Sequence, residues 1–248
     1  MAQVLERGDI YFVYRPRVQQ EAAESLADVQ RSYMVLHPHG KQTYRLLVLG
    51  RKRLPEPRAG ERLWGFVDKV SRKPEDIAEA FEREGYGTKT RGTRARPAAR
   101  PAGEGVYAIV RHDDHTHLAY QLELPEQPGE VQQALGIEPE ASYVLSVKNP
   151  EQPALPGTAL GAKRKADLPK RLQARFQDRR FAAADPPDFL DYEGAEVLLI
   201  GAGEEVSEDL GIRLDPQKET AGTADILREL RMARGRYSTE PLFRGEWR

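Results

Sequence analysis

The amino-acid sequence predicts an α+β fold, made mainly of antiparallel β-hairpins in two barrel-like or curved-sheet lobes with peripheral helices. Short runs rich in β-branched and aromatic residues outnumber the segments that have helical periodicity. Turns join these runs where a parallel sheet would need full crossover helices, so we expect antiparallel pairing. The chain has 248 residues, which is long enough to bury a core without disulfides or a structural metal.

Strands and short helices follow one another in the first third of the chain. Asp9–Arg15 (DIYFVYR) is dense in β-branched and aromatic residues and is closed by Pro16, which predicts a strand. Gln19–Val29 is polar with Ala and Leu at helical spacing, which predicts a short helix. Pro38 and Gly40 separate two apolar runs, so these runs form a hairpin. The other predicted strands here are Tyr33–Leu36, Tyr44–Leu49 and Leu63–Val70, and a helix begins at Lys73-Pro74.

The composition changes at Gly85. Thr88–Gly103 (TKTRGTRARPAARPAG) contains basic residues, Pro and Gly but no acid, no aromatic residue and no apolar periodicity. Such a segment cannot bury enough apolar surface to offset the entropy of ordering it. We therefore expect a basic flexible linker over residues 85–104, between an N-terminal β-rich lobe (1–84) and a second β-rich lobe (105–233).

The second lobe repeats the pattern of strands joined by turns. Val106–Val110 and Leu118–Leu124 flank the turn RHDDHTH and predict another hairpin. Leu168–Phe181 is amphipathic and predicts a basic helix. Ala195–Ile200 is the most continuous apolar run, which is typical of a buried central strand. Further predicted elements are helices at Pro128–Leu135, Glu204–Leu210 and Ala224–Ala233 and a strand at Ser142–Val147.

The last residues, 234–248, are predicted to form an extended C-terminal arm. Phe243 and Trp247 stand close together in it, among basic residues, Pro and Gly. Exposed aromatic side chains favour association, so we expect the arm to dock on its own chain or on a second subunit.

Composition excludes several classes of function. Lys and Arg number 38 and Asp and Glu 39, so the net charge of -1 excludes a globally basic coat for nucleic acid. The absence of cysteine excludes disulfides, thiolate metal sites and a cysteine nucleophile. No apolar run reaches the length of a membrane span or a signal peptide, so we expect no membrane partner and a cytoplasmic location. P-loop, GxSxG and HExxH motifs are also missing.

The stretch Leu198–Val206 (LLIGAGEEV) resembles the start of a dinucleotide-binding unit only in part. Val206 occupies the third glycine position, where it would obstruct close packing of helix on strand. Glu204 and Glu205 would face a pyrophosphate that needs positive potential. We therefore interpret this stretch as a strand followed by a turn.

All five histidines lie in the two predicted hairpin turns. His37 and His39 lie in the first turn, and the second turn combines histidines with Asp113 and Asp114. Imidazole and carboxylate at this spacing can converge on a divalent ion when a turn folds back. Solvated polar turns explain the same residues without a metal. If a metal binds, the ligands in the second turn are His112, His115 and His117.

A second candidate is a basic stripe formed by the linker and the predicted basic helix. Basic residues greatly outnumber acids over Ala162–Phe181. Such a stripe can bind phosphates and gain affinity from counterion release, although a solvated helix face explains the same charges. The predicted phosphate contacts are Arg94, Arg96, Lys163, Arg164, Lys165, Lys170 and Arg171.

Two functions from different classes remain open. The leading one is a non-enzymatic binding protein without a cofactor, which engages nucleic acid or another polyanion through the basic stripe. The alternative is a metal-dependent hydrolase, in which the histidine turn binds a divalent metal and Asp113 or Asp114 acts as general base for a metal-bound water.

Several stretches resemble those of an uncharacterised bacterial protein family. They are GDIYFVYRPRV (Gly8–Val18), RPAGEGVYAIVRH (Arg100–His112) and SYVLSVKNPE (Ser142–Glu151). This resemblance spans most of the chain and implies no activity and no site residue. The stretch RGDIYFV (Arg7–Val13) is also similar to the basic Gly-Asp strand with which toxin nucleases of the MazF type begin. That resemblance is confined to the one strand.

Overall fold

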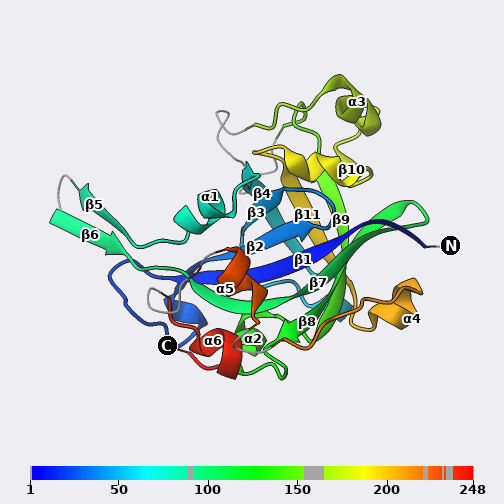
Figure 1. Ribbon diagram of the computed structural model, residues 1–248. Coiled ribbons are helices and arrows are strands. Elements are labelled where there is room, and N and C mark those ends of the chain that lie inside the picture. Colours follow the sequence, from blue (N-terminus) through cyan, green and yellow to red (C-terminus); the bar gives the residue numbers. More distant parts are fainter. Residues whose placement is uncertain are drawn as a thin grey trace.

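The computed structural model describes residues 2–88, 92–153, 165–219, 223–230, 232 and 237–247, with the backbone alone at 86–88 and 92–94. Strands dominate it, and every strand pair in it is antiparallel (Figure 1). The strands are β1 (Gln3–Pro16), β2 (Val29–Pro38), β3 (Tyr44–Leu49), β4 (Arg62–Ser71), β5 (Glu84–Thr88), β6 (Gly92–Arg96), β7 (Arg100–His112), β8 (His115–Leu124), β9 (Glu140–Lys148), β10 (Phe181–Ala183) and β11 (Glu196–Gly203).

The helices are short and lie around the strands. None of those in the described residues has the length and apolar character needed to cross a bilayer. They are α1 (Pro74–Glu79), α2 (Glu130–Leu135), α3 (Lys170–Gln173), α4 (Val206–Leu210), α5 (Asp225–Glu229) and α6 (Glu240–Arg244), with 3₁₀ turns at Leu26–Asp28, Pro57–Ala59, Ala174–Phe176 and Pro187–Asp191.

Eight strands close into one antiparallel barrel, in the order β9-β11-β4-β3-β2-β1-β7-β8, with β8 returning to β9. One edge of β9 serves two partners. Its first half pairs with β8 and its second half with β10, while β11 occupies the other edge. The barrel therefore has no open edge between its first and last strands, which removes a template for unwanted strand pairing.

The barrel interior is filled by side chains from alternate positions of its strands. In β1, Ile10, Phe12 and Tyr14 point inward and are almost fully buried. The ring of Phe12 meets that of Tyr120 from β8 at a centroid distance of 5.0 Å, although β7 separates the two strands in the sheet. Each such side chain stabilises the fold by roughly 1.5–3 kcal/mol through its burial.

The outer face of the barrel is also covered, which explains why DIYFVYR is apolar at consecutive positions. Tyr11 and Val13 point outward and pack with residues of α1, α5 and α6. A separate apolar cluster joins the outer side of β7 and β8 to α4. Figure 1 shows α5 and α6 on one side of the barrel and α4 on another.

The predicted two-lobe arrangement is not confirmed, because strands from both sides of the predicted linker belong to the same barrel. β1 pairs with β7 along most of its length, and β4 pairs with β11. Residues 85–104 themselves contain most of β5, all of β6 and the start of β7. This segment has no apolar periodicity. Its strands are ordered by the backbone hydrogen bonds that they form with their partner strands.

Two predicted helices are shorter than expected. Gln19–Val29 contains only the 3₁₀ turn, because Asp28 accepts hydrogen bonds from the Glu24 backbone and the Ser25 hydroxyl, which compete with helical bonding. Leu168–Phe181 contains α3 and one 3₁₀ turn. Gln177 ends this segment with a left-handed φ of 47°, so the chain turns into β10.

The predicted strand in Leu198–Val206 is confirmed as the end of β11, and a bend leads from it into α4, which begins at Val206. β11 runs through Gly201, and a Cβ atom there would lie 2.1 Å from the carbonyl oxygen of Glu56. The glycine is therefore required by close backbone packing inside the protein.

The C-terminal segment docks on its own chain and is not an extended arm. The carbonyl of Gly245 accepts a hydrogen bond of 3.0 Å from the Val131 backbone, and Gln132 Nε2 donates to the Pro241 carbonyl at 2.9 Å. The rings of Trp247 and Tyr14 meet edge to face at 5.5 Å. These contacts attach α6 to α2 and to the end of β1.

Candidate nucleic-acid interface

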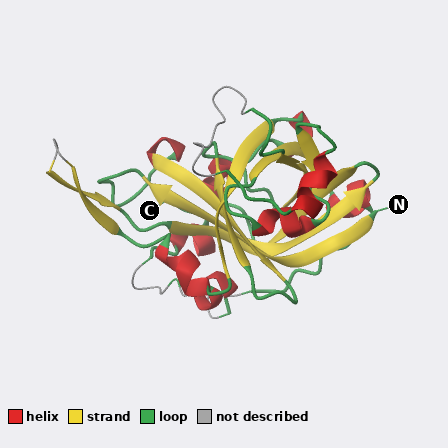
Figure 2. Cartoon of the chain, turned by 90° about the horizontal axis from the view of Figure 1, so that it is seen from above, coloured by secondary structure: helices red, strands yellow, loops and turns green. Residues whose placement is uncertain are grey.

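Strands β5 and β6 form a two-stranded ribbon that is separate from the barrel sheet. The register runs from Glu84 opposite Arg96 to Thr88 opposite Gly92. Figures 1 and 2 show this ribbon standing out from the body in two perpendicular views. The sequence of the ribbon and its turn is basic, and its Lys and Arg residues are Lys89, Arg91, Arg94 and Arg96.

The root of the ribbon is held by one buried arginine of β1. Only 6% of Arg15 is exposed. Its guanidinium donates to the carbonyls of Ala80 and Glu82, just before β5, and of Pro97, just after β6. An isolated two-stranded hairpin is marginally stable in water. These bonds therefore fix both ends of a ribbon that has little apolar surface of its own.

Further contacts reinforce the root from both sides. The backbone N–H of Gln19 donates to the Ala95 carbonyl at 3.0 Å, and that of Ala99 donates to the Phe81 carbonyl at 2.9 Å. Phe81 is fully buried and packs edge to face on Tyr33 of β2. The chain before the ribbon is thus joined through Phe81 to the apolar cluster on the outer face of the barrel.

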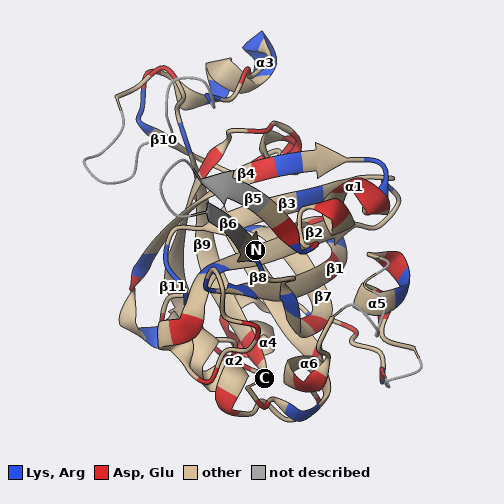
Figure 3. Ribbon diagram, turned by 90° about the vertical axis from the view of Figure 1, so that its left-hand side faces the viewer, with Lys and Arg blue, Asp and Glu red and all other residues tan. Residues whose placement is uncertain are grey.

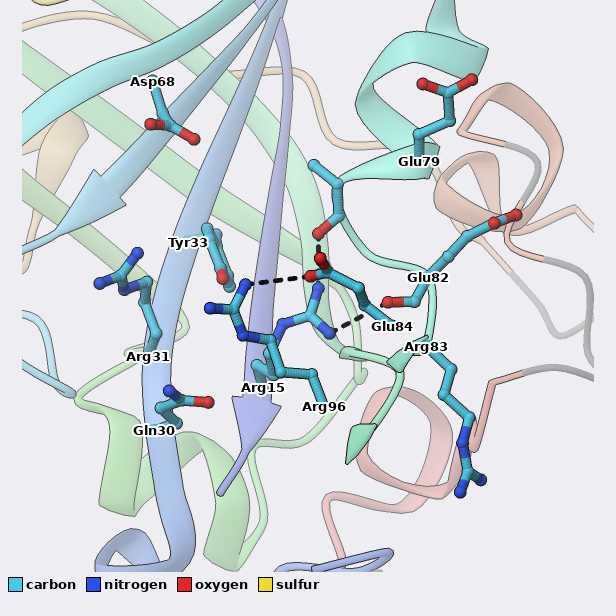
Figure 4. Close-up of a pocket in the computed structure, with 11 residues that line it drawn as sticks. Arg15, Gln30, Arg31, Tyr33, Asp68, Glu79, Glu82, Arg83, Glu84 and Arg96 are labelled. Carbon is cyan, nitrogen blue, oxygen red and sulfur yellow. Dashed lines mark hydrogen bonds and ion pairs between the residues drawn. The ribbon is translucent and has the colours of Figure 1, made fainter. Parts of the chain in front are cut away.

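A polar pocket of about 460 Å³ lies at this root (Figure 4). Arg96 and Glu84 face each other there, with 3.0 Å between Nη1 and Oε2. Figure 4 places Arg31 and Tyr33 on the neighbouring strand β2. The lining mixes both signs of charge: Arg15, Gln30, Arg31, Tyr33, Asp68, Glu79, Ala80, Glu82, Arg83, Glu84 and Arg96.

The predicted basic stripe is divided between two parts of the molecule. Figures 1 and 3 show α3 well apart from the ribbon. Near α3, Lys165 pairs with Glu151 at 2.7 Å and Arg171 with Asp188 at 2.9 Å. Lys170 begins α3 and is exposed. Lys163, Arg164 and the side chain of Arg94 lie outside the described residues, and Arg96 lies at the ribbon root.

The histidines of the β7–β8 turn differ in their surroundings. His117 is buried, and this burial, followed by the charges of His112 and His115, lowers its pKa to about 4. The rings of His112 and His117 are 6.0 Å apart. Among the described residues, the group of three side chains that could hold one metal ion is Asp9, His37 and Glu229. The predicted ligands His112, His115 and His117 do not form that group.

His37 and His39 belong to a charged cluster on the outer face of the barrel. His37 Nδ1 lies 3.0 Å from Glu229 Oε2 and 3.5 Å from Asp9 Oδ2. Nearby carboxylates raise the pKa of His37 to about 9, against the opposing effect of burial. His39 Nε2 lies 2.9 Å from the other oxygen of Asp9. His37 and His117 are therefore not simply solvated turn residues.

Sequence reasoning found the basic ribbon residues but missed the residues that position them. Arg15 lies inside an apolar strand, and its position there was the available signal, since a charge among buried neighbours needs partners. Glu229 gave no local signal, because it meets His37 only through the tertiary fold.

No protein-family model, curated protein or solved structure matches this chain.

Proposed function

We propose that this protein binds double-stranded nucleic acid by inserting the β5–β6 ribbon into the major groove of duplex DNA. The observation that carries the proposal is the ribbon itself, which projects from the barrel and is anchored at its root. The major groove of B-form DNA is about 12 Å wide and admits a two-stranded β-ribbon.

The charge of the ribbon suits phosphate contacts. In the sequence, Lys89 and Arg91 stand between the end of β5 and the start of β6, Arg94 belongs to β6, and no acid follows Glu84 before Glu104. Each phosphate that a basic side chain neutralises releases condensed counterions, which gives affinity independent of base sequence. The net charge of the chain is only -1, so a local basic element is not opposed by a strong overall field.

The anchored root supports the same function. A loose hairpin would lose conformational entropy on binding, and this loss would weaken the complex. Arg15 fixes the chain before and after the ribbon in the free protein. The ribbon therefore needs less ordering when it binds.

The ribbon is a better candidate than α3 for the main contact. Arg171 and Lys165 already pair with carboxylates that would compete with phosphates for them. The ribbon also has a shape that fits a groove, whereas α3 spans only Lys170–Gln173.

The test compares two triple variants with the same loss of charge. One replaces Lys89, Arg91 and Arg94 by Gln, and the control replaces the exposed residues Lys170, Arg175 and Arg180 by Gln. Binding of a labelled mixed-sequence duplex is followed by fluorescence anisotropy at about 50 mM salt, where phosphate contacts are strong. We expect the ribbon variant to lose most of its affinity and the control to keep it. Equal losses, or no binding by the unaltered protein, would contradict the proposal.

A further inference from the structure

A histidine and two carboxylates from three separate elements meet under α5. Asp9 of β1 and His37 of β2 are directly opposite each other in the register. Glu229 ends α5 and reaches the same place from above the barrel face. One ligand atom from each residue lies within 4.8 Å of the other two.

The imidazole nitrogen faces the carboxylates without a hydrogen bond of normal geometry. His37 Nδ1 is buried and has no hydrogen-bond partner of normal geometry, although Glu229 Oε2 lies 3.0 Å and Asp9 Oδ2 3.5 Å from it. Around a metal ion the oxygens are displaced from the lone-pair axis of the nitrogen, because the ion occupies that axis. Ligands at about 2.0–2.2 Å from one ion in a tetrahedral site are separated from one another by roughly 3.3–3.6 Å. The distances of 3.0 and 3.5 Å from His37 Nδ1 to the two carboxylate oxygens lie close to this range, so a small movement of the Glu229 side chain would admit an ion.

Neighbouring side chains hold each of the three groups from outside. The ring of Tyr44 stacks on His37 at 4.2 Å with an interplanar angle of 15°. The Tyr11 hydroxyl donates to Glu229 Oε2 at 2.9 Å, and His39 lies against Asp9. Supporting contacts of this kind orient the ligands of protein metal sites.

We propose that Asp9, His37 and Glu229 bind a divalent first-row transition ion, with Zn²⁺ as the best-suited probe. Mixed imidazole and carboxylate donors suit this class of ion, and three protein ligands leave a fourth position open. Two ligands belong to the barrel and the third to α5, so the ion fastens the C-terminal region to the barrel.

The test uses the full chain after treatment with a chelator, without nucleic acid. Isothermal titration with Zn²⁺ should give one site per chain, and Zn²⁺ should raise the melting temperature. His37→Gln and Glu229→Gln should each weaken binding by at least about tenfold. The matched control is the double variant His112→Gln and His115→Gln, which removes histidines from the β7–β8 turn and should bind as the unaltered protein does.

Three outcomes would overturn the proposal. They are no Zn²⁺ binding by the unaltered protein, binding that survives in both His37→Gln and Glu229→Gln, and binding lost only in the His112→Gln and His115→Gln control. The first would make the cluster an ion pair that involves protonated His37. Glu229→Gln provides a second ligand variant if His37→Gln fails to fold. None of these outcomes depends on whether the ribbon binds DNA.

Discussion

The Nη1 atom of Arg15 lies 3.1 Å from the carbonyl oxygen of Glu82, and the same guanidinium also reaches the carbonyls of Ala80 and Pro97. One side chain of the barrel therefore fixes both ends of the β5–β6 ribbon. Removing it leaves the charges of the ribbon unchanged but releases its root.

Arg15→Met tests this relationship. The variant leaves buried carbonyls without a donor, so we expect a loss of about 1–3 kcal/mol in the free energy of unfolding, measured with urea. We also expect weaker binding to duplex DNA, because the ribbon must then be ordered on binding. The control is Arg31→Met, an exposed arginine of β2, for which stability should change by no more than about 0.5 kcal/mol. Unchanged DNA affinity in Arg15→Met would show that the root does not preorganise the ribbon.

A second buried arginine lies inside one end of the barrel. Arg45 is fully buried, and its Nη1 and Nη2 atoms lie 2.6 and 3.0 Å from the two carboxylate oxygens of Glu6. The Nε atom contacts Asp191 at 2.7 Å, and the Tyr107 hydroxyl donates to Glu6 at 2.9 Å. Every charge in this group has a partner of opposite sign. Arg45 and Glu6 are both buried, so their attraction acts in a medium of low dielectric constant.

Breaking this pair on one side should be more damaging than removing both partners. Glu6→Gln leaves buried Arg45 with Asp191 as its one carboxylate partner in this group, and Arg45→Met leaves the buried Glu6 carboxylate without its bidentate partner. We expect each variant to lower the free energy of unfolding by about 3–5 kcal/mol. The double variant should lose clearly less than the sum of the single losses. Urea unfolding of all four proteins measures the coupling. Additive losses would mean that the two side chains stabilise the barrel independently.

A buried carboxylate should make stability depend on pH. Glu104 accepts hydrogen bonds from the backbone of Ile226 at 2.8 Å and of Asp225 at 3.3 Å, at the start of α5. Burial raises its pKa from 4.5 to about 8. The folded protein therefore holds a proton that the unfolded chain releases between these two values. The stability that this proton provides is complete below pH 4.5 and is lost as the pH rises through 8.

Glu104→Gln removes this titration. For one proton the slope reaches at most about 1.4 kcal/mol per pH unit, so the variant should show a flatter fall of stability across this range than the unaltered protein. Urea unfolding at several pH values measures both slopes. Glu126→Gln, at an exposed carboxylate, serves as control and should keep the original slope. The same slope in Glu104→Gln as in the unaltered protein would contradict the role of Glu104.

Local sequence patterns predicted most of the strands because their residues prefer extended backbone and are buried on at least one face. The hairpins β2–β3 and β7–β8 follow this pattern. Barrel closure was not predictable in the same way. The pairs β1–β7 and β4–β11 join distant segments, and no local pattern encodes which strands meet. The two-lobe prediction arose from this limit.

In the candidate sites, too, local features could be predicted from the sequence and long-range contacts could not. The basic residues of the ribbon were visible in the sequence, but the ribbon was not, since Thr88–Gly103 has no apolar alternation. His37 was visible as a turn residue. Its partner Asp9 depends on the β1–β2 register, and Glu229 depends on where α5 packs. The positions of charged residues are evident from the sequence, whereas which side chains meet in space depends on the tertiary fold.

The salt dependence of DNA binding measures how many phosphates the ribbon residues contact. The slope of log affinity against log salt is measured for the unaltered protein, for the triple Gln variant of Lys89, Arg91 and Arg94, and for the triple Gln variant of Lys170, Arg175 and Arg180. If the ribbon residues contact phosphates, the slope for the first variant should fall in magnitude by up to about 2.7, at about 0.9 per phosphate, while the second variant keeps the original slope. An unchanged slope in the ribbon variant, or a fall confined to the α3 variant, would show that the ribbon residues do not contact the phosphates.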